Sequence, residues 1–164
     1  MRSSWLTAVA LGLLVLLTGC GDGPDHQRSV PTPEEPVPLP EGEEEIHAEF
    51  EELSELTIPE TAEDVDITAD HGWANLPLYH VTFTTDPDGV EEFCSGENFG
   101  IYELPDPPDE EERERFDITE DTVDGMTRCT GAGIEQRTER EVIVVWPEED
   151  VAAVHAIVAE IPPG

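Results

Sequence analysis

The sequence contains no lysine, and its positive charge comes from seven arginines against 40 aspartates and glutamates. The formal net charge is −33 at pH 7. Because nucleic acids and acidic membrane surfaces are themselves anionic, a chain this acidic repels both. The composition therefore predicts no nucleic-acid partner, and it says nothing direct about the fold.

Long hydrophobic runs are also scarce. The main apolar run extends only from Trp5 to Leu17, whereas a helix that crosses a bilayer needs about 20 apolar residues. A run of this length is typical of the hydrophobic part of a secretory signal peptide. Arg2 is the only basic residue before it. The pattern favours an export signal over an uncleaved membrane anchor.

The residues that close this run, Leu17-Thr18-Gly19-Cys20, resemble the lipobox of a bacterial lipoprotein. The resemblance implies that residues 1–19 are removed and that Cys20 is linked to diacylglycerol, a palmitate-type anchor. The implied location is the extracytoplasmic face of the cell membrane, which the protein contacts through the lipid on Cys20. Secretion without lipid stays open as an alternative. The chain is rich in Ala, Gly and Asp and lacks Lys. In this composition it resembles small uncharacterised cell-surface lipoproteins of actinobacteria.

Proline is concentrated in the segment that follows Cys20. Six prolines lie between Gly21 and Glu45, among many acids and few large apolar residues. Such a segment cannot form a core and behaves as a semi-extended spacer. We therefore divide the chain into a signal peptide at residues 1–19, a disordered Pro/Glu-rich spacer at residues 20–45, and a single domain at residues 46–164.

The domain alternates between strand and helix patterns. Strand patterns occur at residues 65–68, 78–85, 126–130, 134–137 and 140–146, and helix patterns at residues 46–58, 87–96, 109–115 and 147–161. Three prolines predict irregular structure just before Asp109. We expect an α+β fold, with a small mixed or antiparallel sheet and helices on one face. The same order of patterns occurs twice: a strand, a second and clearer strand, and a helix that begins at a proline. This suggests either a ββα duplication or a coincidence, because strand-to-helix junctions of this kind are common.

Only three cysteines occur, and the lipobox assigns one of them, Cys20, to the lipid. The remaining pair, Cys94 and Cys129, is even in number and belongs to a compartment where disulfides persist. We predict a disulfide between them. A catalytic thiol at Cys94 is the alternative, and it would need a histidine base and a reducing environment.

Sequence motifs typical of catalytic, metal-binding and phosphate-binding sites are also missing. The sequence has no metal-ligand spacing among its histidines, no GxSxG nucleophile elbow and no phosphate-binding glycine loop. Asp86–Gly89 and Asp121–Gly125 are better explained as a helix cap and a turn than as calcium loops. We therefore predict no catalytic residue, no metal site and no cofactor.

A few aromatic and histidine residues are candidates for a binding surface. Trp73, Tyr79 and Tyr102 fit either a binding patch or ordinary packing. His80 and His155 could meet across the predicted repeat, or each could be a hydrogen-bonded or surface histidine. The sequence does not decide between these readings.

The charge is unevenly distributed along the chain. Neither arginine nor lysine occurs from Ser29 to Glu112. The acids of this segment either form a solvated surface or attract cations or a basic partner. Our hypothesis is a membrane-anchored extracytoplasmic module that binds an unknown protein or small molecule without catalysis. The alternatives are a cell-envelope hydrolase with paired carboxylates and a weak divalent-cation binder.

Overall fold

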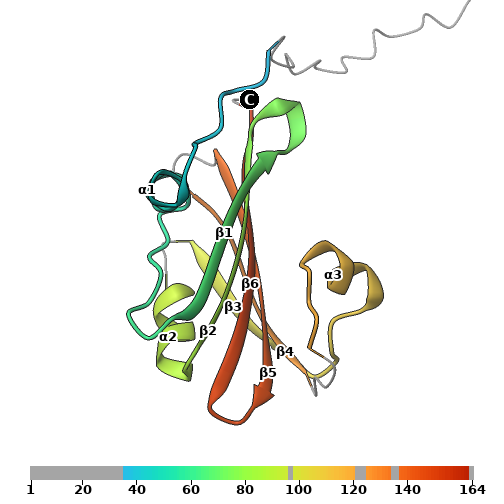
Figure 1. Cartoon of the computed structure of the whole chain (residues 1–164). Helices are drawn as coiled ribbons and strands as arrows, with labels where there is room; N and C mark the ends of the chain where they lie inside the picture. Colours follow the sequence, from blue (N-terminus) through green and yellow to red (C-terminus); the bar gives the residue numbers. More distant parts are fainter. Residues whose placement is uncertain (1–34, 96–97, 121–124, 134–136, 163–164) are drawn as a thin grey trace, which may run out of the picture.

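A computed structural model of the chain describes residues 35–95, 98–120, 125–133 and 137–162. These residues form one six-stranded sheet with three α-helices and one short 3₁₀ helix (Figure 1). The expected signal peptide, the lipobox with Cys20 and the first part of the spacer lie outside the described residues. So does most of the expected turn at Asp121–Gly125.

Every neighbouring pair of strands in the sheet is antiparallel. The strand order is β1-β2-β6-β5-β4-β3, so β1 and β3 are the two edges of an open sheet. The helical elements are α1 (Glu43–Ser54), η1 (Trp73–Asn75), α2 (Pro87–Phe93) and α3 (Glu110–Arg115), and the strands are β1 (Glu63–His71), β2 (Pro77–Thr85), β3 (Phe99–Leu104), β4 (Met126–Ala132), β5 (Thr138–Glu148) and β6 (Val151–Glu160). The α+β class and the antiparallel sheet are confirmed.

The predicted C-terminal helix at residues 147–161 is wrong. Most of that segment forms β6, which lies in the middle of the sheet between β2 and β5. A central strand buries both faces: Val154 and Val158 face one apolar layer, while Ala153 and Ile157 face the other. A nearly continuous apolar run of this kind satisfies a helical period as easily as a strand. Without a second helix, the ββα duplication is not confirmed.

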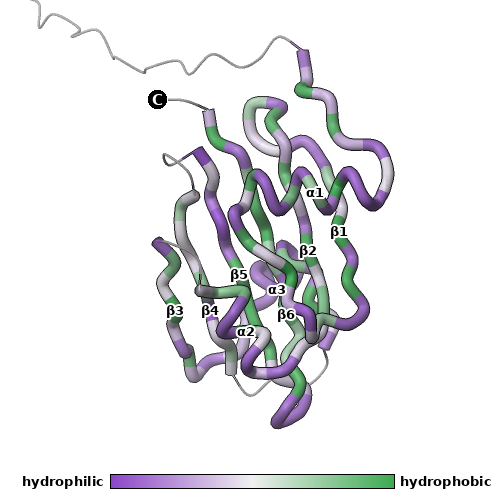
Figure 2. The backbone as a smooth tube through the Cα atoms, turned by 90° about the vertical axis from the view of Figure 1, so that its left-hand side faces the viewer, coloured by the Kyte–Doolittle hydropathy of each residue, from purple (hydrophilic) through white to green (hydrophobic). Residues whose placement is uncertain are grey.

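An apolar layer lies on each face of the sheet. Helices α1 and α2 cover one face, where Phe50 and Phe93 pack against the strands. Phe116, at the end of α3, packs with Ile143 on the opposite face. Figure 1 shows α3 across the sheet from α1 and α2, and Figure 2 shows hydrophobic residues concentrated along the strands. The expectation of helices on one face is therefore right for α1 and α2 and wrong for α3.

Two helices, α2 and α3, begin at capping aspartates, of which the sequence predicted the one at Asp86. The side chain of Asp86 accepts a hydrogen bond from the backbone N–H of Gly89 at 2.8 Å, and Pro87 occupies the first turn of α2. Asp109 and Glu112 form a reciprocal capping box at the start of α3. Short polar side chains at these positions pair with backbone N–H groups that the helix leaves unpaired.

The sequence did not predict strand β3. It lies in the stretch expected to be irregular, and it pairs along its whole length with β4. Because it is an edge strand with both faces partly exposed, it lacks the alternation of buried and polar residues that reveals a half-buried strand. The second strand of the expected hairpin, at residues 134–137, lies mostly outside the described residues. β4 pairs instead with β5, which contains the strand expected at residues 140–146.

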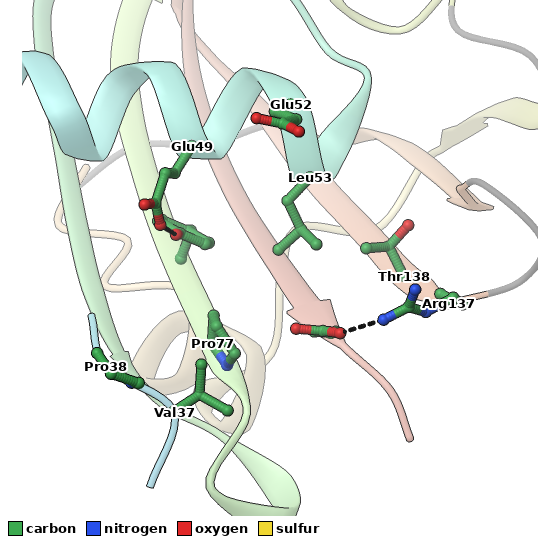
Figure 3. A pocket seen from close by; sticks show the side chains of 10 residues that line it. Val37, Pro38, Glu49, Glu52, Leu53, Pro77, Arg137 and Thr138 are labelled. Atoms are coloured by element: carbon green, nitrogen blue, oxygen red, sulfur yellow. Dashed lines mark hydrogen bonds and ion pairs between the residues drawn. The ribbon is translucent and has the colours of Figure 1, made fainter. Parts of the chain in front are cut away.

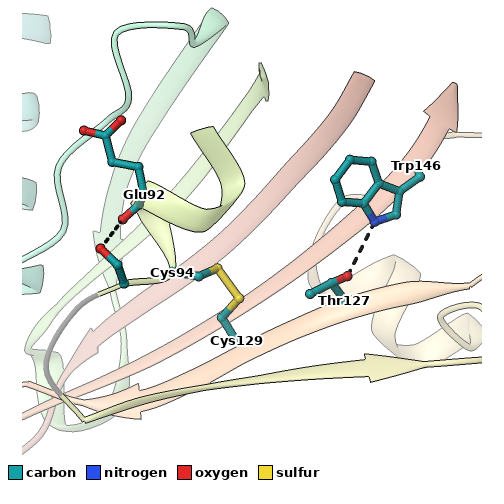
Figure 4. Close-up of a disulfide and its surroundings, with 6 residues drawn as sticks. Glu92, Cys94, Thr127, Cys129 and Trp146 are labelled. Atoms are coloured by element: carbon teal, nitrogen blue, oxygen red, sulfur yellow. Dashed lines mark hydrogen bonds between the residues drawn. A yellow bond between two sulfur atoms is a disulfide. The ribbon is translucent and has the colours of Figure 1, made fainter. Parts of the chain in front are cut away.

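The predicted disulfide is present between Cys94 and Cys129, whose Cα atoms are 5.9 Å apart (Figure 4). Cys94 caps the C-terminal end of α2, Cys129 lies in β4, and both are buried. The bridge therefore fastens α2 to the sheet. In the described part of the chain, no helix combines the length and apolar character needed to cross a membrane.

Candidate ligand-binding cleft

A cavity of about 480 Å³ lies between α1, the segment that precedes it, and the ends of β2, β5 and β6 (Figure 3). We call it the α1 cleft. Its lining comprises Val37, Pro38, Glu49, Glu52, Leu53, Pro77, Tyr79, Arg137, Thr138 and Glu160. The volume lies within the range of small-molecule sites, which also combine an apolar lining with a few polar groups.

One wall of the α1 cleft is the end of the predicted spacer. The N–H of Val37 donates to the carbonyl oxygen of Asn75 at 3.2 Å. Nε2 of His71 lies 2.8 Å from the carbonyl oxygen of Val37, and because a carbonyl can only accept, the ring N–H is the donor. These bonds hold Val37 and Pro38 beside Pro77, while Leu53 enters the cleft from α1.

The other side of the α1 cleft is polar and acidic. The hydroxyl of Tyr79 donates to Oε2 of Glu49 at 3.3 Å. Nη2 of Arg137 lies 2.8 Å from Oε1 of Glu160, forming an ion pair at the rim. With Glu52 added, the lining contains three carboxylates and one guanidinium. The cleft therefore presents a negative potential to a ligand.

Burial and the nearby charge of Glu49 raise the pKa of Tyr79 from 10.0 to about 12. Burial is the larger cause, because removing the phenolate from water costs free energy. The negative charge of Glu49 and its hydrogen bond to the hydroxyl act in the same direction. The neutral phenol is thus the form that the fold stabilises.

This shift predicts a loss of stability at high pH. The folded state holds the Tyr79 proton more tightly than the unfolded state, so its contribution is complete below pH 10 and is lost as the pH rises to about 12. The loss should be on the order of 2 kcal/mol. Urea unfolding at a series of pH values, compared with Tyr79→Phe, measures it. An equal decline in the Tyr79→Phe variant would contradict the assignment.

A second, smaller cavity of about 230 Å³ lies on the opposite face of the sheet, over β2 and β6. It includes His155, whose Nδ1 donates to the carbonyl oxygen of Phe116 at 3.1 Å. Nε2 of the same ring lies 3.3 Å from Oε1 of Glu120. Asp64 and Asp117 also line this cavity.

The residues singled out in the sequence do not form one patch. Tyr79 is buried in the α1 cleft, Trp73 is exposed in η1, and Tyr102 is exposed on β3 at the other edge of the sheet. His80 and His155 lie on neighbouring strands, offset because His155 is paired with Thr82. No sequence pattern indicated that Leu53, Arg137 and Glu160 would meet, because only the tertiary fold brings them together.

Within the described ranges, no group of three or more His, Cys, Asp or Glu residues could hold a metal ion. The weak cation-binding hypothesis therefore gains no specific site from these residues. The fold and the cleft define an α+β protein built on an open antiparallel sheet, with a ligand-sized cavity under its first helix. No protein-family model, curated protein or solved structure matches the chain.

Proposed function

We propose that this protein is a lipid-anchored module at the extracytoplasmic face of the cell membrane, and that it binds a ligand in the α1 cleft without catalysing a reaction. The ligand would carry an apolar body and a cationic group. The observation that supports this proposal is the lining of the α1 cleft, which combines apolar side chains with three carboxylates. Both a free small molecule and a side chain of a partner protein fit this description.

The chemistry of the α1 cleft favours a cation over an anion. Glu160 is already paired with Arg137, whereas Glu49 and Glu52 lie on α1 with no arginine paired to them among the ion pairs of the described residues. A cationic group between them would gain charge-assisted hydrogen bonds, while its apolar body covers Leu53. The overall charge of −33 adds a long-range attraction for such a ligand.

Neutralising the acids of α1 is expected to weaken binding of a hydrophobic cation. In the Glu49→Gln/Glu52→Gln variant, the affinity for 4-phenylbutylammonium should fall about tenfold, equal to about 1.4 kcal/mol. The control Glu110→Gln/Glu111→Gln removes the same charge from α3 and should change the affinity less than about twofold. Calorimetry and chemical-shift mapping measure both. Equal losses in the two variants would mean that net charge alone attracts the probe, and the cleft assignment would be wrong.

The anchor is tested separately, because it rests on the lipobox at residues 17–20. Cys20→Ala should remove the acceptor of the lipid, so the protein should leave the membrane fraction or remain unprocessed. Thr18→Ser is the matched control, since it keeps both Leu17 and Cys20, and it should partition like the wild type. Fractionation of cells followed by immunoblotting measures this. Normal processing and membrane retention of Cys20→Ala would contradict a lipid anchor.

One observation favours the hydrolase as a second candidate. The smaller cavity places the carboxylates of Asp117 and Glu120 beside His155, with Oε2 of Glu120 buried. A hydrolase would use such groups to move protons. In that case Glu120→Gln would abolish a turnover on envelope substrates while the fold stays intact, whereas a binding module would show no such turnover to lose.

A further inference from the structure

The two edges of the sheet differ in how they are protected. Strand β1 carries several acids, and a register shift between Glu63 and Asp66 interrupts its pairing, with Asp64 in a left-handed conformation. Bulges and charges of this kind prevent another strand from adding to an edge. Strand β3 keeps a regular antiparallel register from Phe99 to Leu104 and carries one acid, Glu103. Among the described residues, no strand pairs with its outer side.

Strand β3 also exposes two large side chains in succession. Ile101 is 51 % exposed and Tyr102 is 55 % exposed. Because successive residues of a strand point to opposite faces, Ile101 lies on the face of α2 and Tyr102 on the face of α3. An added strand would cover apolar surface on both faces while it pairs with the backbone of β3.

A cavity of about 330 Å³ adjoins the C-terminal end of β3. Its lining includes Glu103, Thr127 and the indole of Trp146, whose Nε1 donates to Oγ1 of Thr127 at 3.5 Å (Figure 4). Ile101 and Glu103 are two residues apart and therefore share a face of the sheet. A carboxylate beside an indole is a suitable environment for a lysine or arginine side chain.

The backbone behind β3 is held firmly. In the register of the sheet, Ile101 is opposite Cys129, the residue of β4 that is bonded to Cys94. The disulfide therefore ties the strand next to β3 to helix α2. An incoming strand would meet an ordered template, which reduces the entropy lost on binding.

We propose that the outer edge of β3 binds an extended segment of a partner protein as an additional antiparallel strand. The segment would place an apolar side chain against Ile101 and a lysine or arginine between Glu103 and Trp146. In this mode of recognition the main-chain hydrogen bonds supply affinity and the side-chain pockets supply specificity. This surface is separate from the α1 cleft, and the proposal does not depend on that cleft.

Two other occupants of this edge are disfavoured. The chain's own spacer has six prolines between Gly21 and Glu45, and each lacks the N–H that a strand must donate. A second copy of the protein would bring together two molecules that each carry a charge of −33. A basic segment of another protein can donate its backbone N–H groups, and its positive charge is complementary to the negative charge of this protein.

The test uses the full-length protein and the fluorescent hexapeptide Thr-Thr-Lys-Thr-Val-Thr, with binding followed by fluorescence anisotropy. The lysine and valine of this peptide are two positions apart and share a face, so antiparallel pairing can place the lysine at Glu103 and the valine at Ile101. Ile101→Lys should weaken binding at least about tenfold, because it places a like charge at the centre of the edge. Val65→Lys, on β1, is the matched control with the same change of charge and should alter binding less than about twofold. Glu103→Gln should weaken the lysine peptide more than its glutamine counterpart.

Two further peptides distinguish strand addition from plain charge attraction. A peptide of equal charge with a central proline should lose most of its affinity, since proline removes a backbone donor. Protection of the β3 amides from hydrogen exchange should accompany binding of the original peptide. Equal binding of the proline peptide, unchanged binding by Ile101→Lys, or dimers of the protein that Ile101→Lys dissociates would each overturn the proposal.

Discussion

Arg140→Ala is expected to lower the free energy of unfolding by about 3–5 kcal/mol, the range found when one member of a buried polar pair is removed. Arg140 lies near the start of strand β5 and is only 1 % exposed, although it is an arginine. Its Nη1 donates to the carbonyl oxygen of Ser54 and its Nη2 to that of Ala132, each at 2.9 Å. Without these donors, two carbonyl groups lose their partners in the interior.

Further contacts explain why a charged side chain is tolerated at this position. Nη1 of Arg140 lies 3.8 Å from Oε2 of Glu55, and the guanidinium lies 4.7 Å from the centre of the Phe99 ring. Ser54 ends α1, where the helix dipole also favours a positive charge. Burial lowers the pKa of Arg140, whereas the charge of Glu55 acts in the opposite direction. The side chain thus joins α1, β4 and β5.

Arg137→Ala is the matched control for this prediction. Arg137 is three residues away and makes an ion pair with Glu160, but it is exposed, and such surface pairs contribute about 1 kcal/mol or less. The free energy of unfolding of Arg140→Lys should lie between those of the two alanine variants, because an ammonium group cannot reproduce the planar arrangement of guanidinium donors. Urea unfolding at neutral pH measures all three variants. If Arg140→Ala and Arg137→Ala had the same midpoint, the buried contacts of Arg140 would contribute little to stability.

Removing the disulfide is expected to have an effect of similar size. The Cys94→Ala/Cys129→Ala variant should be less stable by about 4 kcal/mol, because the bridge closes a loop of 35 positions in the unfolded chain. Reducing agent should destabilise the wild type to a similar degree. The same reagent should not change the stability of the double variant, which therefore serves as the control for the wild type.

The measurement also tests the pairing itself. Intact mass after alkylation, with and without prior reduction, reports whether the two thiols of the exported protein are free. Two free thiols, or a wild type whose urea midpoint does not respond to reductant, would contradict the bridge. In that case Cys94 would return as a candidate for thiol chemistry.

Features that depend on neighbouring residues could be predicted from the sequence. The caps at Asp86 and Asp109 determine where α2 and α3 begin, because a side chain pairs with N–H groups three residues away. Strand β2 was evident from its concentration of β-branched and aromatic residues. The disulfide followed from the small number of cysteines.

Features that depend on distant segments were decided only by the tertiary structure. β6 is a strand because it lies between β2 and β5, and its apolar residues alone are compatible with a helix. The α1 cleft combines Val37 with Glu160, residues from opposite ends of the described chain. Arg140 becomes a buried residue because α1 ends above it. Periodicity reports which residues prefer to be buried, whereas the packing of whole elements determines which surfaces and partners bury them.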